Sequence, residues 1–467
     1  MSLKIFNTLT NAKELFTPIE PGNVRMYVCG VTVYDSAHIG HARSFFTFDI
    51  IYRYLKFSGF DVRYVRNFTD VDDKIITKAN DERVSCDAIT GRYIEEFAQD
   101  GESLGWLRPA REPRATEHMA EIIAIIEKLE AKGLAYRVDG DVYYAVSGFA
   151  DYGKLSRKKI DELEAGARVE VDERKRSPLD FALWKSSKPG EPTWDSPWGA
   201  GRPGWHIECS AMSTKYLGQP FDIHGGGRDL IFPHHENEIA QSEGAFGQAL
   251  ARYWIHAGFL NINQEKMSKS LGNFFTIRDI LGEFDAVALR HFFLGSHYRN
   301  PLDFSKDGLV EASKAADRIF DTIERLGKSI KASAPAIADG ALMESFRQEM
   351  DDDFNTPRAL ALIFDEVRAL NKLLDEKQTK GIAARYSALR SMCDVLGLLQ
   401  EGYFDRKKQR WLKNSVLSEG EILAAIGQRN QARKAKNFPE ADRIRDQLNR
   451  QGVAIEDTPE GTIWKVR

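Results

Sequence analysis

Long hydrophobic runs are absent from this sequence of 467 residues. No stretch of about 18 consecutive apolar side chains occurs, so nothing predicts a helix that spans a membrane. The first 16 residues, MSLKIFNTLTNAKELF, also lack the basic start and apolar centre of an export signal. We therefore expect a cytoplasmic protein without a membrane partner.

Cysteine is also scarce. The four cysteines, Cys29, Cys86, Cys209 and Cys393, lie far apart and show no paired spacing. This argues against a framework of disulfides and fits a reducing compartment. Free thiols in such a compartment are usually buried in the core, and some of them bind metals.

A strong excess of charge is missing as well. With 65 Lys and Arg against 69 Asp and Glu, the formal net charge is −4. This argues against indiscriminate binding of nucleic acid but not against a local basic patch. Residues 405–467 hold 14 basic and 9 acidic side chains. On charge alone, a solvated helix surface explains this patch.

What the sequence does contain is the pattern of an α/β domain. A β-branched and aromatic strand at 25–33, a helix at about 40–58 and a second strand at 61–65 form a βαβ unit. Such units imply parallel pairing in a doubly wound, Rossmann-type sheet. The pattern resumes with a helix, a strand, a helix and a strand at 207–217, 221–224, 234–244 and 253–258.

Between these halves, residues 138–204 alternate strand-like pieces with charged and Pro/Gly/Trp-rich stretches, which indicates an insertion. Residues 309–399 are helical throughout and predict a bundle. A helical stretch at 419–448 and a hairpin at 455–466 predict a small α+β module at the end. The predicted division of the chain is 1–137, 138–204, 205–258, 259–308, 309–404 and 405–467.

The segment His38-Ile39-Gly40-His41 lies where the first strand has ended and the helix begins. Ligands of doubly wound sheets bind at this edge, and a helix N-terminus offers free backbone N–H groups to a phosphate. Gly40 would let a purine or ribose approach the backbone, and His38 and His41 can face one phosphate. The alternative is that the two histidines only cap the helix.

The segment Lys266-Met267-Ser268-Lys269-Ser270 follows a predicted strand and a turn. The ammonium groups of Lys266 and Lys269 could neutralise a triphosphate as charge builds on the leaving pyrophosphate. Alone, an ordinary basic loop explains this segment better. Together and in this order, the two segments predict an enzyme that splits Mg-ATP between its α- and β-phosphates to activate a carboxylic acid.

Cys29, Cys209, His234 and Glu238 form a third candidate set. His234 and Glu238 are spaced i, i+4 and share one face of a predicted helix, whereas residues 235–237 should face elsewhere. Two thiolates, an imidazole and a carboxylate suit zinc. Buried core cysteines and a surface His–Glu pair are the alternatives that the long spacing leaves open.

Longer segments accompany these motifs along the sequence. They are MYVCGVTVYD (26–35), RNFTDVDDKI (66–75), GWHIECSAM (204–212), DIHGGGRDLIFPHHENEIAQSE (222–243), MDDDFNTPRAL (350–360), RNQAR (429–433) and ADRIRDQL (441–448). With the two phosphate-binding segments, they make the chain resemble class I aminoacyl-tRNA synthetases. Within that class it resembles the cysteinyl-tRNA synthetase family over nearly its whole length.

The resemblance implies that a monomer attaches L-cysteine to the tRNA for cysteine through a cysteinyl-adenylate formed from ATP. It also implies that His38, His41, Lys266 and Lys269 are catalytic. Three of the predicted regions then take roles in binding tRNA: a signature loop with stem contacts in 259–308, an anticodon-binding bundle in 309–404 and a recognition module in 405–467.

The resemblance further implies one zinc ion per protein molecule, with Cys29, Cys209, His234 and Glu238 as its ligands. Zinc prefers a thiolate to the hydroxyl of serine, so the substrate cysteine would bind as a zinc thiolate and no editing domain would be needed. The other implied site residues are Gly30, Thr69 and Trp205 around the amino acid, and Gly40, His224, Gly225, Gly226, Gly227, Asp229 and Lys269 around ATP. A flexible loop is the alternative for the glycine run.

Two other functions stay open at this point. A ligase with the same cysteine-activating core could transfer cysteine to an amino-sugar acceptor, although the C-terminal third would have no purpose on a sugar. A catalytically inactive paralogue could bind tRNA only, although the two intact signature segments argue against it. A charging assay separates these functions from the first.

Overall fold

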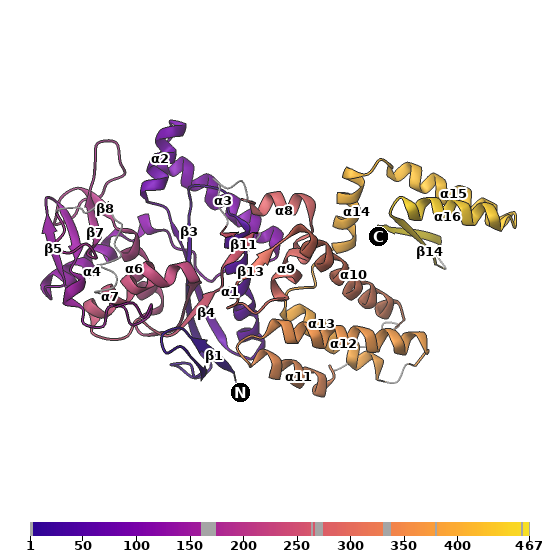
Figure 1. Ribbon diagram of the computed structural model, residues 1–467, viewed down its shortest axis with the longest axis horizontal. Helices are drawn as coiled ribbons and strands as arrows, with labels where there is room; N and C mark the ends of the chain where they lie inside the picture. Colours follow the sequence, from indigo (N-terminus) through magenta and orange to yellow (C-terminus); the bar gives the residue numbers. More distant parts are fainter. Residues whose placement is uncertain are drawn as a thin grey trace.

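The computed structural model describes residues 3–159, 174–262, 265–266, 274–329, 338–378, 381–458 and 461–466. Lys269 lies outside these ranges, and of Lys266 only the backbone is described. Figure 1 shows an elongated molecule, with the sheet-containing part at one end, a group of helices beside it and the C-terminal helices at the other end. Among the described helices, none is both long and apolar enough to cross a membrane.

The central sheet has four parallel strands in the order β10 (Ala251–Ala257), β9 (Phe221–Gly227), β3 (Asn23–Thr32) and β4 (Asp61–Thr69). The helix α1 (Ile39–Phe57) connects β3 to β4 and completes the predicted βαβ unit. The prediction of a parallel, Rossmann-type sheet is thereby confirmed.

Helices cover both faces of this sheet. On one face, Met26 and Val28 of β3 pack with α1. On the other face, Tyr27 and Cys29 pack with residues of α6 (Trp205–Leu217). Because successive side chains of a strand point to opposite faces, β3 presents Tyr27 and Cys29 together to α6.

A separate antiparallel sheet occupies the predicted insertion and begins three residues before its predicted start at 138. Its strands are β5 (Ala135–Val138), β6 (Asp141–Tyr144), β7 (Phe181–Ser186) and β8 (Gly201–Pro203). Lys185 and Arg202 of this sheet form ion pairs with Asp73, at the start of α2 (Asp73–Glu82). These ion pairs fix the insertion against the segment that follows β4.

The following helices and strands complete the first two-thirds of the protein. They are β1 (Lys4–Asn7), β2 (Ala12–Leu15), α3 (Cys86–Leu104), α4 (Met119–Ala131), α7 (Glu236–Phe246), β11 (Leu260–Ile262), β12 (Glu265–Lys266), α8 (Ile277–Glu283), α9 (Ala286–Leu294) and β13 (Leu302–Phe304). β11 pairs with both β12 and β13. Lys266, the first residue of the second signature segment (Lys266–Ser270), therefore lies in an edge strand of a small sheet.

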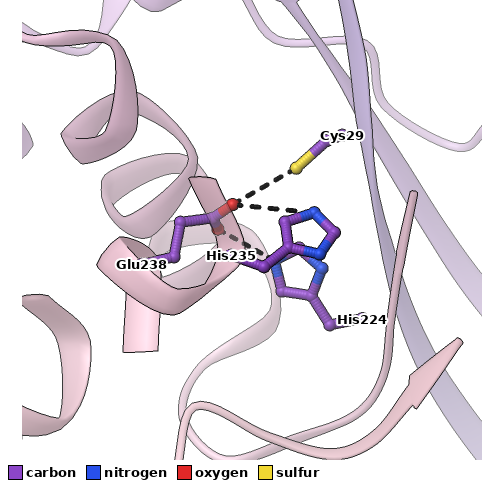
Figure 2. A group of neighbouring side chains, drawn as sticks. All are labelled: Cys29, His224, His235 and Glu238. Atoms are coloured by element: carbon purple, nitrogen blue, oxygen red, sulfur yellow. Dashed lines mark hydrogen bonds and ion pairs between the residues drawn. The ribbon is translucent and has the colours of Figure 1, made fainter. Parts of the chain in front are cut away.

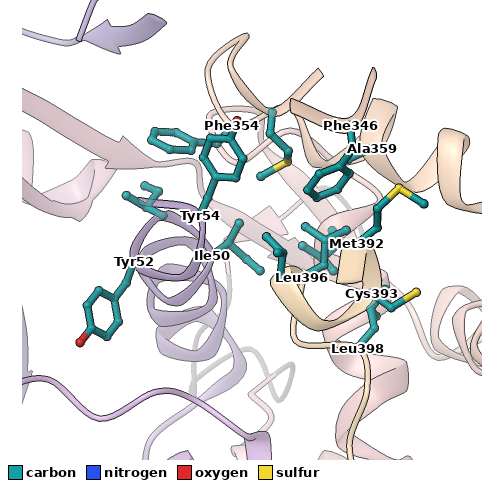
Figure 3. Close-up of a cluster of buried hydrophobic side chains, with 14 of the residues drawn as sticks. Ile50, Tyr52, Tyr54, Phe346, Phe354, Ala359, Met392, Cys393, Leu396 and Leu398 are labelled. Atoms are coloured by element: carbon teal, nitrogen blue, oxygen red, sulfur yellow. The ribbon is translucent and has the colours of Figure 1, made fainter. Parts of the chain in front are cut away.

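The predicted helical bundle follows. Its helices are α10 (Lys306–Ser329), α11 (Gly340–Met350), α12 (Thr356–Asp375) and α13 (Ile382–Val395). Figure 3 shows Ile50 and Tyr54 of α1 facing Phe346, Met392 and Leu396 of the bundle, within one buried cluster. The bundle therefore packs directly on α1, the helix that begins within the first signature segment (His38–His41).

The C-terminal module has a small hydrophobic core of its own, which includes Ile422, Ile444 and Trp464. It consists of α14 (Tyr403–Asn414), α15 (Glu419–Lys434), α16 (Phe438–Arg450), β14 (Val453–Thr458) and β15 (Gly461–Val466). The two strands form the predicted hairpin. Lys465 of this hairpin forms ion pairs with Asp321 and Glu324 of the bundle helix α10.

Candidate active site

The start of α1 is organised by its two histidines. His38 is the N-cap, and its Nδ1 accepts hydrogen bonds from the backbone N–H groups of Gly40 (3.1 Å) and His41 (3.3 Å). The His41 side chain accepts one in return from the His38 N–H (3.3 Å), and the two rings stack at 3.6 Å. Capping thus describes the helix start, while the catalytic role of both residues stays a prediction.

The ring of His41 is electrically neutral at pH 7. Burial and the neighbouring His38 hold the pKa of His41 well below its usual value of 6.5. A neutral imidazole can still donate a hydrogen bond to a phosphate oxygen, but it brings no positive charge. The positive charge needed by a phosphate bound here would therefore have to come from other groups.

The residues that follow the second signature segment lie against the first. The N–H of Ile39 donates to the Phe275 carbonyl (3.1 Å), and the N–H of Ile277 donates to the Ala37 carbonyl (2.9 Å). The ring of Phe274 meets His38 edge-on at 5.4 Å. The predicted lysine side chains lie outside the described residues, but the backbone just after their segment is anchored beside His38.

The glycine run belongs to the end of β9 and is not a flexible loop. A side chain on Gly225 would come within 2.2 Å of the Phe48 ring of α1, and one on Gly226 within 2.8 Å of His235. Asp229 follows in a short turn. Close packing against α1 and the turn before α7 explains why β9 carries glycines here. Their predicted contact with adenosine is not tested by this packing.

The four predicted ligands come together in the protein interior. The Cys29 sulfur lies 3.7 Å from the Cys209 sulfur and 3.3 Å from Glu238 Oε1. His234 Nε2 lies 3.0 Å from the same Glu238 oxygen. One donor atom from each of the four residues fits within 4.8 Å of all the others, and all four residues are buried. They come from β3, α6, α7 and the turn that leads into α7.

A second set overlaps the first and corrects one expectation. Cys29, His224, His235 and Glu238 also place their donor atoms within 4.8 Å of one another (Figure 2). His235 was expected to face away from Glu238, but its Nε2 lies 3.9 Å from Glu238 Oε1. The reason is the spacing: His235 and Glu238 are i, i+3 apart and His235 has helical backbone angles, so their side chains share one face of the helix.

His224, predicted to contact adenosine, is fully buried and hydrogen-bonded to Glu238 (Nε2 to Oε2, 2.8 Å). Its ring stacks on Trp254 at 4.4 Å. In the described residues, this histidine therefore orients a predicted metal ligand. Its contact with adenosine stays a prediction.

Three residues around the cluster were not predicted from the sequence. His206 Nδ1 contacts His234 Nδ1 at 2.9 Å, which orients the predicted ligand. Asn67 Oδ1 accepts the Gly30 N–H (2.9 Å), and Glu208 accepts the Thr69 hydroxyl (2.9 Å). The only available signal was their proximity in sequence to Cys209 and Thr69.

The predicted amino-acid pocket surrounds the same cluster. Thr69 is buried beside Glu208, and a side chain on Gly30 would overlap the Asn67 carbonyl oxygen, at 1.6 Å. Trp205 is 39% exposed, and its ring lies 4.3 Å from that of His234. An exposed aromatic ring beside buried ligands is suited to cover a small substrate.

The pKa values of the two cysteines and of His234 depend on one another. Burial raises the pKa of Cys29 well above its usual value. Burial also opposes ionisation of Cys209, but the Cys29 thiol and His234 lower the pKa of Cys209 to about 6. Burial would lower the pKa of His234, yet Glu238 and Cys209 raise it to about 10. A divalent cation would replace the protons that this arrangement retains.

Several of the buried polar atoms without partners lie around the cluster. Among the described residues, the atoms without a hydrogen-bond partner include Tyr27 Oη, Glu208 Oε1, His224 Nδ1 and His235 Nε2. Buried polar groups are normally paired, so such a group of unpaired atoms indicates a site for a further charged component. Together with two sulfur, one nitrogen and one oxygen donor, it fits a zinc ion.

The basic residues of the C-terminal module are largely paired with acidic ones. Arg429 and Arg433 both form ion pairs with Asp457, and Arg443 forms one with Glu440. This supports the interpretation that much of the basic patch is a solvated surface.

Comparison with known families covers most of the sequence. Residues 15–314 match the catalytic domain of "tRNA synthetases class I (C)". Residues 345–400 match the DALR domain, and residues 419–464 match the "Cysteinyl-tRNA ligase anticodon binding domain".

Individual relatives agree. A cysteine–tRNA ligase of Geobacter sulfurreducens is 53% identical, with 100% of both proteins covered, and one of Thioalkalivibrio sulfidiphilus is 54% identical, with 99% of each covered. Among solved structures, Mycobacterium tuberculosis methionyl-tRNA synthetase with methionyl-adenylate matches at a TM-score of 0.58 and 18% identity, over 80% of this protein and 90% of that one. A LeuRS from Agrobacterium radiobacter, in a ternary complex with tRNA, has a TM-score of 0.61 and 11% identity, over 85% and 86%. The structures share the fold, and the sequence matches show that the chain belongs to the cysteine–tRNA ligase family of class I aminoacyl-tRNA synthetases.

Proposed function

We propose that this protein attaches L-cysteine to its cognate tRNA through an ATP-dependent cysteinyl-adenylate. The observation that carries the proposal is the buried cluster of Cys29, Cys209, His234 and Glu238 near the end of β3, the strand that leads into α1. The likeness to cysteine–tRNA ligases over the full length supports the same activity.

Cys29, Cys209, His234 and Glu238 would hold one zinc ion. When bound there, zinc would take the thiolate of the substrate as an additional ligand and discriminate against the hydroxyl of serine. His206 contacts His234 at Nδ1 and so directs its Nε2 toward Glu238. We favour this ligand set over the one that includes His224 and His235 because it offers two sulfur donors.

Gly30, Thr69 and Trp205 would bind the rest of the amino acid. Glu208 accepts the Thr69 hydroxyl, and a side chain at position 30 would overlap the backbone oxygen of Asn67. The partly exposed ring of Trp205 would cover the substrate and exclude water from it.

ATP with magnesium would bind across the start of α1. His38 and His41 would donate hydrogen bonds to the α-phosphate while the cysteine carboxylate attacks it in line, and Lys266 and Lys269 would draw out pyrophosphate. No protein nucleophile is required, and a terminal ribose hydroxyl of tRNA would then take the cysteinyl group. The residues that would hold the nucleotide are Gly40, His224, Gly225, Gly226, Gly227, Asp229 and Lys269.

The remaining regions would bind tRNA. In this proposal, 1–137 and 205–258 form the catalytic domain, 138–204 is its insertion, 259–308 contacts the tRNA stem, 309–404 is the anticodon-binding bundle and 405–467 reads the anticodon loop. The matches at 345–400 and 419–464 support the last two roles. They also weigh against an amino-sugar acceptor, which has no anticodon. A monomer is expected, and the cytoplasm is the expected compartment.

Charging of purified tRNA with radiolabelled cysteine tests the proposal. The zinc-loaded protein should form cysteinyl-tRNA and should exchange pyrophosphate into ATP only when cysteine is present. Exchange without tRNA charging would favour the amino-sugar ligase instead. Loss of both activities in a folded, zinc-loaded protein would favour an inactive tRNA-binding paralogue.

A further inference from the structure

Tyr27 is a fully buried residue that neither the ligand set nor the catalytic proposal uses. It lies two positions before Cys29 on β3, and both side chains point to the face that α6 covers. Its ring meets His224 edge-on at 5.4 Å. Its hydroxyl finds no partner at hydrogen-bonding geometry among the described residues. A buried hydroxyl without a partner is costly and calls for an explanation.

The surroundings of this hydroxyl include both proposed cysteine ligands. Tyr27 packs in one buried cluster with Cys29 and Cys209. Because Tyr27 and Cys29 lie two apart on one strand, both side chains point to the face on which α6 carries Cys209. A phenol is protonated at neutral pH, so the Tyr27 hydroxyl can act as a hydrogen-bond donor.

The charge of the proposed metal site explains the need for such a donor. Two thiolates and one carboxylate carry three negative charges against the two positive charges of zinc. A substrate bound as a thiolate would add one more in a buried environment. Uncompensated charge is expensive there, so hydrogen-bond donors around the sulfurs stabilise the loaded site. A metal-bound thiolate is also a better acceptor than the weakly accepting sulfur of a thiol.

We propose that Tyr27 is a positioning residue that donates a hydrogen bond from its hydroxyl to the thiolate of Cys209 when zinc is bound. This inference rests on the proposed zinc site and names a residue that tunes it. Among the described residues the hydroxyl has no hydrogen-bond partner, and a metal-bound Cys209 thiolate would supply one. Tyr27 touches neither substrate nor ATP and acts through Cys209.

The substitution Tyr27→Phe tests this directly because it removes one oxygen atom and keeps the ring. Zinc affinity, measured by competition with a chelator at fixed pH, should fall about tenfold, the lower end of the effect of losing a group that supports a metal ligand. The melting temperature of the metal-free protein should stay equal or rise, since a buried hydroxyl without a partner is lost. In the cobalt-substituted protein, the sulfur-to-metal charge-transfer band should shift to lower energy.

Tyr253→Phe is the matched control. Tyr253 is also buried, but its hydroxyl donates to the Leu15 carbonyl (3.1 Å) and accepts the Thr17 N–H (3.0 Å). This variant should melt at a lower temperature with and without metal, and its zinc affinity and cobalt spectrum should match the wild type. Equal zinc affinities of wild type and Tyr27→Phe would overturn the inference alone. A wild-type protein that binds no zinc would overturn both the inference and the proposed function.

Discussion

The buried ligand cluster and the C-terminal module use polar residues in opposite ways. Around Cys209 and His234, polar atoms are buried and several lack partners among the described residues. In the module, the buried Arg429 and the exposed Arg433 both form ion pairs with the exposed Asp457. The first region has the donor set of a cation site, whereas in the second the arginines are already paired with carboxylates.

This difference shows where each region can meet a ligand. The buried cluster offers two sulfur atoms and a carboxylate as donors, and this donor set suits a cation. A module with paired charges offers its ligand only the basic side chains that remain at its surface, such as the exposed Lys434 and Lys436. A count of basic residues therefore overstates the surface available to tRNA.

The largest expected effect is on the rate of ATP–pyrophosphate exchange, without a change in zinc binding. Replacement of Lys269 by alanine should lower cysteine-dependent ATP–pyrophosphate exchange by about a hundredfold or more, because a positive charge that acts on the leaving pyrophosphate is lost. Zinc content should stay at the wild-type value. Normal exchange in this variant would refute the role of the lysine.

A smaller effect is expected at the module surface. Changing Lys434 and Lys436 together to glutamate should weaken tRNA charging about tenfold through KM, because contacts with phosphates are lost and repulsion is added. Exchange in the absence of tRNA should not change. Lys188→Glu, at an exposed position of the insertion, is the control and should charge normally. If the double variant and the Lys188→Glu control had the same effect on KM, a specific role of the module surface would be excluded.

The smallest expected effect is on the stability of the module, through the ion pair between Arg429 and Asp457. Arg429 holds the pKa of the Asp457 carboxyl below its usual value, so this carboxylate stabilises the module above about pH 4 and loses that effect as the pH falls further. Because Asp457 is partly exposed, Asp457→Asn should cost less than about 1 kcal/mol at pH 7. Hydrogen exchange of α15 and β14 measures this. Equal protection of wild type and variant from pH 7 to pH 3 would show that the ion pair contributes nothing.

Sequence patterns predicted the elements that carry the site better than the contacts within it. The strand and helix around His38 follow from hydrophobic periodicity, which is local. Cys29, Cys209, His234 and Glu238 were grouped by their chemistry and by family resemblance, and they do come together. The contact between His206 and His234 depends on how α6 meets the turn before α7, so no spacing in the sequence reveals it. The contact between His235 and Glu238, by contrast, follows from their i, i+3 spacing, which the sequence does show.

For Tyr27, the sequence also predicts the position in the strand but not the surroundings of the side chain. Its spacing of two from Cys29 in a predicted strand already places both on one face. Only the folded protein shows that this face is closed by α6 and that the hydroxyl finds no partner among the described residues. The inference about Tyr27 therefore depends on this unpaired hydroxyl and could not be made from the residue type alone.

The proposed activity rests on selection of cysteine by a metal held at Cys209, and one experiment tests it most directly. Zinc content and the ratio of exchange rates with cysteine and with serine should be measured for Cys209→Ser beside the wild type. Because serine is a poor ligand for zinc, the variant should hold well below one zinc per protein molecule and lose about tenfold or more of its preference for cysteine. A folded Cys209→Ser protein with full zinc and undiminished selectivity would contradict metal-based selection.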